Sequence, residues 1–317
     1  MSFVEASKRC NRDALIPTLS DWSHFVGQRT VRALNQLGTE LVTRSEYEGV
    51  SNMLRSIQSL KGSAVGASDG VLGSVDEVYF DDEAWGVRYL VVDTGSWLKG
   101  HRVLISPYSV KHTDPGASTV SVDLTREQVK NSPTIDTRQP VSRQHEVDYL
   151  RYYGYPAYWG GRDSWGMGGF PVLGPMQIGP GIQPGLFEPV EPDTDASPED
   201  VHLRSTDAVT GYHIEARDGS IGHVSGFIFD DEAWVIRYLT VDTRNWWPGG
   251  KTVLLATAWV DSVDWFGSSV FTDLTREAIK NCPDYDDLVP LSRTYETALH
   301  TFHSKDGYWT KGNSAAR

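Results

Sequence analysis

The chain has 317 residues, of which 39% are hydrophobic and 22% are charged, and its formal net charge is -13. These values are typical of a globular protein with room for two or three domains of about 100–150 residues each. The acidic balance, without any cluster of Lys and Arg, excludes a protein that binds nucleic acid mainly through its phosphates.

Cysteine usage and hydropathy narrow the class of protein further. The two cysteines, Cys10 and Cys282, have no CxxC or Cys/His spacing, so we expect neither a disulfide framework nor a zinc site. The N-terminus has no apolar signal core, and no run approaches the ~18 apolar residues of a membrane helix. We therefore expect a cytoplasmic protein without a transmembrane segment.

The sequence contains a duplication. Residues Phe80–Trp85 return as Phe229–Trp234 at an offset of 149 residues, and Asp123–Glu127 return as Asp273–Glu277 at an offset of 150. Solenoid and propeller repeats have periods of only about 20–50 residues. The duplication therefore predicts two copies of a whole domain.

The paired positions also give the domain boundaries. We divide the chain into an N-terminal extension (1–52), a first repeat (53–153), a linker (154–200), a second repeat (201–309) and a tail (310–317). The extension is either a genuine arm with one short helix around Trp22–Leu37, or the product of a start upstream of a natural start at Met53. The linker is rich in Gly, Pro and aromatic residues and then acidic, which is typical of a tether. The alternative is that its aromatic residues Tyr158, Trp159, Trp165 and Phe170 lie on a barrel surface or on a partner.

Each repeat is predicted to be mainly β. Short strands are expected at 71–80, 85–94, 102–105, 108–112 and 119–122, with counterparts at 220–229, 252–255, 258–263 and 269–272. A short helix capped by Thr125 or Thr275 follows, and a second helix is expected at 142–152 or 292–303. Closely spaced short strands favour a small, closed or nearly closed antiparallel β-barrel in each repeat.

A family resemblance lies in several of these segments. The pattern Gly70-x-x-Gly73-x-Val75, the acidic turn before Trp85, Arg88–Asp93 and the strand Val103–Pro107 resemble the PRC-barrel domain. That family includes the cytoplasmic domain of the photosynthetic reaction-centre H subunit and the C-terminal domain of the ribosome maturation factor RimM. The resemblance covers roughly 53–160 and 202–309, and it implies a docking platform with no catalytic residues to carry over.

The acidic turns are the clearest candidate metal site. Three carboxylates stand in a row in each repeat: Asp81, Asp82 and Glu83, and Asp230, Asp231 and Glu232. A calcium loop spaces its oxygen ligands at alternating positions, so we interpret these residues as solvated turns, with a weak cation site as the alternative. No cofactor is expected.

Ten paired positions are interpreted as structural: Gly70, Gly73, Trp85, Arg88 and Asp93, and Gly219, Gly222, Trp234, Arg237 and Asp242. The glycines allow close backbone packing, and the aspartates accept hydrogen bonds from turn amides. The arginines are expected to leave the core face and to pair with the acidic turn, which is worth about 0–1 kcal/mol if the pair is exposed.

Aromatic residues are the candidate interface. They are Trp97, Trp246, Trp247, Trp259, Trp265, Tyr158, Trp159, Trp165 and Phe170, of which Trp247, Trp259 and Trp265 have no counterpart in the first repeat. Interfaces favour such anchors. The alternative is that they cover the linker or the other repeat.

These observations predict a non-enzymatic scaffolding protein, in which the two repeats pack face to face as a covalent version of a homodimer. Its partners are expected to be unidentified proteins and not nucleic acid; a homo-oligomer and a membrane-associated complex at the inner-membrane surface both remain open. The resemblance implies, as an alternative, a subunit or assembly factor of a photosynthetic reaction centre. An enzyme or small-ligand binder that uses the cleft between the repeats is a third interpretation.

Overall fold

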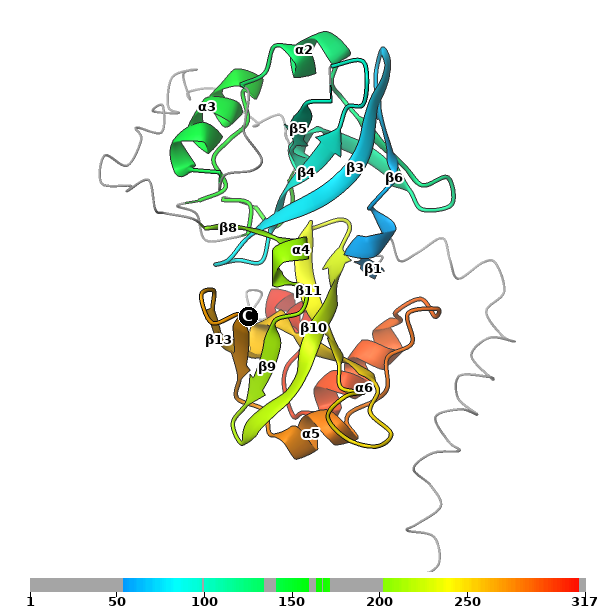
Figure 1. The fold of residues 1–317 in the computed structure, drawn as a ribbon, viewed down its shortest axis with the longest axis vertical. Helices are drawn as coiled ribbons and strands as arrows, with labels where there is room; N and C mark the ends of the chain where they lie inside the picture. Colours follow the sequence, from blue (N-terminus) through cyan, green and yellow to red (C-terminus); the bar gives the residue numbers. More distant parts are fainter. Residues whose placement is uncertain are drawn as a thin grey trace, which may run out of the picture. The chain divides into compact units, whose positions relative to one another are not determined.

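A computed structural model describes residues 54–98, 100–133, 141–159, 164–166, 168–171 and 202–313 (Figure 1). All of them lie within one compact unit that runs from Asn52 to Arg317. The N-terminal extension, Met53 and the linker residues 172–200 lie outside the described residues. No helix in the described ranges is long and apolar enough to cross a membrane.

The first repeat contains seven strands followed by two helices. Its elements are β1 (Leu54–Ser56), η1 (Ile57–Ser59), β2 (Ala64–Ala67), β3 (Gly70–Asp81), β4 (Val87–Asp93), β5 (Arg102–Ile105), η2 (Pro107–Ser109), β6 (Val110–Asp114), β7 (Thr119–Val122), α2 (Arg126–Lys130) and α3 (Arg143–Tyr153). The predicted bounds of β5 and β7 are confirmed. Helix α2 begins with the expected capping box, in which the side chains of Thr125 and Gln128 each bond the other residue's backbone amide.

The second repeat follows the same order. Its elements are β8 (Leu203–Ser205), α4 (Thr206–Val209), β9 (His213–Ala216), β10 (Gly219–Asp230), β11 (Val235–Asp242), β12 (Thr252–Ala256), η3 (Thr257–Trp259), β13 (Val260–Asp264), β14 (Ser269–Thr272), α5 (Arg276–Asn281), α6 (Arg293–Phe302) and η4 (Tyr308–Asn313). The Thr275 side chain caps α5 alone, as expected from the loss of the glutamine partner.

The two sheets have the same topology. Their strand orders are β5-β4-β3-β2-β7-β6 and β12-β11-β10-β9-β14-β13. The prediction of a mainly β fold with short helices after each sheet is confirmed. The structure differs from the predicted closed antiparallel barrel in two details. First, β2 pairs with β7, and β9 with β14, in parallel. Second, each sheet ends at its edge strands and does not close. The parallel pairs depend on β2 and β9, four-residue strands that carry too little alternation to be predicted.

Glycines are required where β3 and β10 pass over the end of the next strand. A Cβ atom added to Gly73 would lie 1.9 Å from the carbonyl oxygen of Asp93, and one added to Gly222 would lie 2.7 Å from that of Asp242. Neither backbone oxygen can move without breaking the sheet. The expected role of these glycines in close backbone packing follows from this contact.

The two repeats exchange their first strands (Figure 1). Strand β1 pairs with β10 of the second repeat, and β8 pairs with β3 of the first. The registers correspond, since Leu54 faces Asp230 and Leu203 faces Asp81. This pairing of one repeat thus recurs in the other, as expected for a covalent version of a homodimer.

Backbone hydrogen bonds at the contact between the two repeats, called the seam below, are reciprocal as well. The amide of Val87 donates to the carbonyl of Trp234 at 2.8 Å, and the amide of Ile236 donates to that of Trp85 at 2.8 Å. The seam therefore consists of main-chain pairing in addition to side-chain packing.

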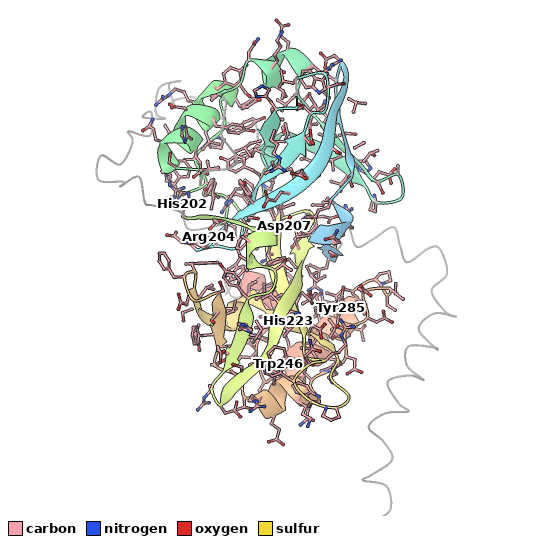
Figure 2. The ribbon with its side chains drawn as sticks, viewed as in Figure 1. His202, Arg204, Asp207, His223, Trp246 and Tyr285 are labelled. Carbon is pink, nitrogen blue, oxygen red and sulfur yellow. The ribbon has the colours of Figure 1, made fainter. Side chains whose placement is uncertain are left out.

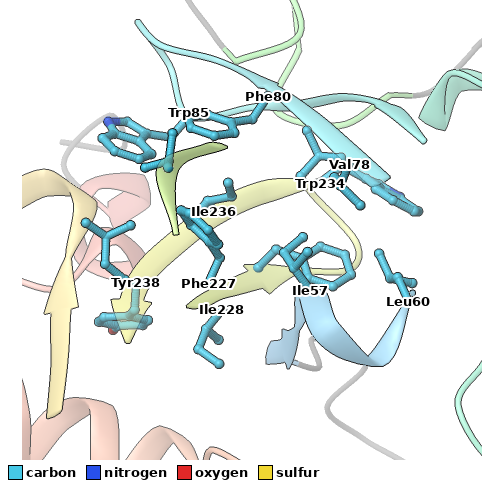
Figure 3. Packing of buried hydrophobic residues seen from close by; sticks show 14 of the residues in the cluster. Ile57, Leu60, Val78, Phe80, Trp85, Phe227, Ile228, Trp234, Ile236 and Tyr238 are labelled. Carbon is cyan, nitrogen blue, oxygen red and sulfur yellow. The ribbon is translucent and has the colours of Figure 1, made fainter. Parts of the chain in front are cut away.

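The repeats share a hydrophobic core. One cluster includes Ile57, Phe80 and Trp85 of the first repeat together with Phe227 and Trp234 of the second (Figure 3). The Phe80 ring stacks on Trp85 at 5.3 Å and lies 5.9 Å from Phe227. Strand exchange thus places side chains of both repeats in one interior. We therefore expect the repeats to unfold together.

Part of the predicted linker is packed. Tyr158 and Trp165 are 6% and 4% exposed, and the Trp165 indole donates a hydrogen bond to the carbonyl of Ala233 at 2.7 Å. The description of the whole linker as a tether is therefore wrong for these residues, because their rings cover a buried arginine described below.

Candidate functional site

The first carboxylate of each acidic turn is buried. Asp81 is 4% exposed, and its oxygens accept hydrogen bonds from the amides of Ala84 at 2.7 Å and Gly86 at 3.0 Å. Asp230 is 1% exposed and accepts from the amide of Ala233 at 3.0 Å. The prediction of a solvated turn is wrong for these two residues, because they organise the turn from inside.

The other carboxylates of the turns face outward or bind the opposite repeat. Glu83 and Glu232 are exposed. The Asp82 carboxylate lies 2.9 Å from Arg204 Nε, and the Asp231 carboxylate lies 3.9 Å from Arg55 Nη1. These reciprocal ion pairs link each turn to the exchanged strand. No three His, Cys, Asp or Glu side chains converge in a metal-binding arrangement within the described residues.

Arg88 is buried as an ion pair with Asp81. Its Nε and Nη2 atoms both lie 2.7 Å from Asp81 Oδ2, and its guanidinium lies over the rings of Tyr158 at 3.8 Å and Trp165 at 4.5 Å. The expected partner is confirmed, but the expected exposure is wrong, because the two rings cover the side chain after it leaves the sheet.

Arg237 makes the corresponding ion pair in a more open setting. Its Nη2 lies 3.1 Å from Asp230, its guanidinium lies over Tyr308 at 4.1 Å, and its side chain is 22% exposed, compared with 2% for Arg88. A Cβ atom at Gly86 would lie 2.5 Å from the Arg88 guanidinium, and the second repeat has Val235 at this position. The absence of a side chain at Gly86 makes room for the deeper burial of Arg88.

A buried glutamate joins the second helix of each repeat to its sheet. Glu146 Oε1 accepts from the hydroxyls of Tyr89 at 3.1 Å and Tyr158 at 2.6 Å, and its Oε2 lies 2.5 Å from His202 Nε2. Sequence reasoning missed this residue. The available signal was the pattern Ser-Arg-x-x-Glu, which opens the helix in both repeats.

The second repeat reproduces this network at Glu296. Its carboxylate accepts from the Tyr238 hydroxyl at 2.8 Å and lies 2.9 Å from Arg293 Nη1. Burial raises the pKa of Glu296 and of Tyr238, so the tyrosine stays protonated and donates. Both glutamates are at most 2% exposed, and their partners are protein groups, so the networks anchor helices and do not present a reactive carboxylate.

Histidines distinguish the helix of the second repeat. The Trp259 ring lies 4.8 Å from the ring of His300 and 4.9 Å from that of His303. Burial, followed by the neighbouring His300 and Lys305, lowers the pKa of His303 from 6.5 to about 4, and burial also lowers that of His300.

We expect these histidines to make stability depend on pH. A His whose pKa is lower in the folded state contributes stability above the unfolded value of 6.5, and this contribution is lost as the pH falls toward about 4. Glu296 acts in the opposite direction, since its pKa is raised. The His303→Tyr variant, which copies Tyr153 of the first repeat, should therefore lose less melting temperature than wild type between about pH 7 and pH 5. Parallel profiles for the two proteins would contradict this expectation.

Most of the candidate interface aromatics contact other residues of the same chain. Tyr158, Trp165 and Trp259 are buried, so their predicted exposure is wrong. Trp97, Trp159, Trp246, Trp247 and Trp265 are half-buried, and Phe170 is exposed. Trp97 lies under the Arg126 guanidinium at 4.5 Å, Trp265 lies under that of Arg204 at 4.2 Å, and Trp246 lies 5.9 Å from the ring of His223 (Figure 2). These three contacts lie within one repeat, so the alternative of covering the linker or the other repeat fits Trp165, which bonds Ala233, and not these residues.

The strand-end aspartates make the expected turn contacts. Asp93 Oδ1 accepts from the amide of Gly95 at 2.8 Å, and Asp242 Oδ1 accepts from that of Arg244 at 2.8 Å. Gly70 and Gly219 adopt positive φ angles of 144° and 122° at the start of β3 and β10. All of these positions serve the turns and sheets.

Comparison with known families agrees with the repeated sheet. Residues 54–129, from β1 into α2, match the family model of the PRC-barrel domain. The chain contains a PRC-barrel domain. The second repeat has the strand order of this PRC-barrel and exchanges a strand with it. A comparison with curated proteins finds no match.

Four exposed apolar side chains of the second repeat have no apolar counterpart in the first. Phe266 is fully exposed, and Leu288, Val289 and Phe271 are 87%, 54% and 39% exposed. At the equivalent positions the first repeat has Gly116, Arg138, Gln139 and Ser121. Sequence reasoning missed these four residues, although a position-by-position comparison of the repeats carries the signal.

Among the pockets of the described surface, two have similar volumes. One, of about 570 Å³, lies between η1, α4 and β10, where Lys61 and Asp207 form an ion pair at its edge. The other, of about 530 Å³, lies between the PRC-barrel domain and the end of α3, and four of its lining residues are tyrosines: Tyr108, Tyr152, Tyr153 and Tyr155.

Proposed function

We propose that this chain is a non-enzymatic protein-interaction protein, in which a PRC-barrel and its repeat form one docking platform. The observation that carries the proposal is a contrast between interior and surface. The charged residues kept in both repeats bind one another inside the protein, whereas four exposed apolar residues of the second repeat have polar residues or glycine at the equivalent positions of the first.

The interior groups are poorly suited to chemistry on a substrate. A general acid or base must reach the proton that it transfers, but Asp81 and Glu146 are at most 4% exposed and are bonded to protein groups. Opposite charges beside each carboxylate balance its charge and fix its orientation. These features support a structural role for the groups shared by the repeats.

The surface of the second repeat is suited to binding proteins. Aromatic and large apolar side chains are the usual anchors of protein interfaces. Phe266 and Leu288 are the most exposed apolar side chains of the described residues, and each replaces a glycine or an arginine of the first repeat. The difference between two copies of one fold supports a role beyond folding.

A narrower version of the proposal is a subunit or assembly factor of a photosynthetic reaction centre. Its support is the PRC-barrel match, because the reaction-centre H subunit carries this domain. Recovery of reaction-centre polypeptides with the chain would favour this version over a general scaffold.

Affinity purification of the tagged full chain from its native host, followed by mass spectrometry, tests the proposal. We expect specific proteins to co-purify, and we expect Phe266→Gly with Leu288→Arg, which restores the first-repeat residues, to reduce their recovery. Val71→Ser is the matched control, since Val71 is 63% exposed and the second repeat has Ser220 there. A chain that purifies without partners, or with a tightly bound metabolite alone, would contradict the proposal.

A further inference from the structure

We propose that the tyrosine-lined pocket of the first repeat binds a proline-rich segment of a partner protein, an inference that rests on the proposed interaction function. The pocket is bounded by the start of β6, the end of β7, α2 and the end of α3. Its volume of about 530 Å³ lies in the range of ligand-binding clefts.

The four tyrosine rings form a continuous row. The ring of Tyr152 lies 4.8 Å from that of Tyr153, Tyr153 stacks on Tyr155 at 5.3 Å, and Tyr155 lies 5.4 Å from Tyr108. Proline-rich segments adopt an extended left-handed helix with three residues per turn, and they bind to grooves lined by aromatic rings in this way. The row of rings therefore offers such a segment an aromatic surface, on which Tyr152 is 41% exposed.

The rings are held in place before a ligand arrives. The Tyr152 hydroxyl donates to the carbonyl of Gln128 at 2.9 Å, Tyr153 packs on Tyr149 at 4.8 Å, and Tyr108 packs on Trp165 at 4.9 Å. A preformed site loses little conformational entropy when it binds. Proline-rich segments are themselves pre-ordered, so both sides of the contact start close to their bound form.

Polar groups at the rim complete the match. A polyproline helix makes no internal hydrogen bonds, so its carbonyls need donors. The exposed Gln128 side chain accepts from the Thr125 amide through Oε1, and its amide nitrogen can donate. Lys111 supplies an ammonium group 2.8 Å from the Asp123 carboxylate. The two charges balance, which favours an uncharged proline-rich segment over a strongly acidic or basic peptide.

The second repeat fills the equivalent place with its own side chains. Trp259 stands where the first repeat has Ser109, is 4% exposed and packs on His303. Lys305, the counterpart of Tyr155, lies 2.5 Å from the Asp273 carboxylate. The second repeat thus fills this position with its own Trp259 ring, whereas the first repeat leaves the pocket open. We therefore expect one bound segment per chain.

Fluorescence anisotropy of a labelled oligoproline peptide, titrated with the full chain, tests the proposal. We expect saturable binding with one site per chain, and none for a Gly/Ser peptide of equal length. Tyr152→Ala should weaken binding about tenfold or more, whereas Phe302→Ala, at the equivalent position of the second repeat, should leave it unchanged. Tyr152 and Phe302 are 41% and 46% exposed, so both variants should keep the wild-type melting temperature.

Absence of saturable binding, or an equal loss in both variants, would overturn the proposal. Binding that appears only after Pro175, Pro180 and Pro184 are replaced by Ser would also overturn it, since the occupant would then be this chain's own segment. If partners co-purify equally with wild type and Tyr152→Ala, the pocket proposal fails and the interaction function stands. If the peptide binds but no partner co-purifies, the interaction function fails, and with it the assignment of the segment to a partner protein, whereas the affinity of the pocket for proline-rich segments stands.

Discussion

Asp81→Ala is expected to lower the free energy of unfolding by about 3–5 kcal/mol, because it leaves the Arg88 guanidinium buried without its counter-charge. The variant also removes the acceptor of the amides of Ala84 and Gly86. Chemical denaturation of the full chain measures the loss. The rings of Tyr158 and Trp165 over Arg88 block its route to water, so relaxation should recover little of it.

Asp230→Ala is the matched control for this prediction. Its partner Arg237 is 22% exposed, so that charge can reach solvent, and the expected loss is smaller than for Asp81→Ala. The double variant Asp81→Ala with Arg88→Met should regain part of the stability, because no unpaired charge remains in the interior. Equal losses for the two aspartates, or no recovery in the double variant, would contradict the buried ion pair as the cause.

Trp85→Ala and Trp234→Ala are each expected to cost about 3–5 kcal/mol, the range for removing a large aromatic side chain from a core. The residues are 9% and 4% exposed and lie in the cluster that both repeats share. For a unit of this size the melting temperature should fall by roughly 6–20 °C. Because the two repeats share this core, each variant should shift a single unfolding transition that includes both repeats. It should not produce a separate transition for one repeat.

Backbone conformation provides the control for these variants. Trp85 and Trp234 have φ angles of 57° and 51°, a region that is unfavourable for residues with a Cβ atom. Glycine at either position relieves this strain, so Trp85→Gly should be no less stable than Trp85→Ala. Unchanged melting temperatures in the alanine variants would place the rings outside the core and contradict the shared interior.

The covalent link between the two repeats has two consequences for the scaffold interpretation. A covalent pair of repeats fixes the strand exchange at a ratio of one to one, which a homodimer achieves only above its dissociation constant. It also allows the two surfaces to differ. The tyrosine pocket in one repeat and Phe266 in the other are features that a symmetric dimer would have to carry twice.

The sequence by itself determined the duplication, the mainly β class, the capping box of α2 and several strand bounds. These features depend on short-range patterns, such as the Thr125-x-x-Gln128 spacing or alternation within β7. The contacts of Asp93 with a turn amide are equally local. The resemblance to the PRC-barrel also came from residues close together in the chain.

Only the tertiary structure decided which charged groups are buried and which repeat each exchanged strand pairs with. Three-residue strands such as β1 and β8 carry almost no pattern, and their partners lie in the other repeat, so no local rule could pair them. Arg88 alternates with apolar residues as an exposed side chain would, and it is buried because Tyr158 and Trp165 return from the linker to cover it. Glu146 likewise became an anchor through the hydroxyls of distant tyrosines. Contacts between residues far apart in the sequence set the environment of a charged side chain, and a local sequence pattern does not contain this information.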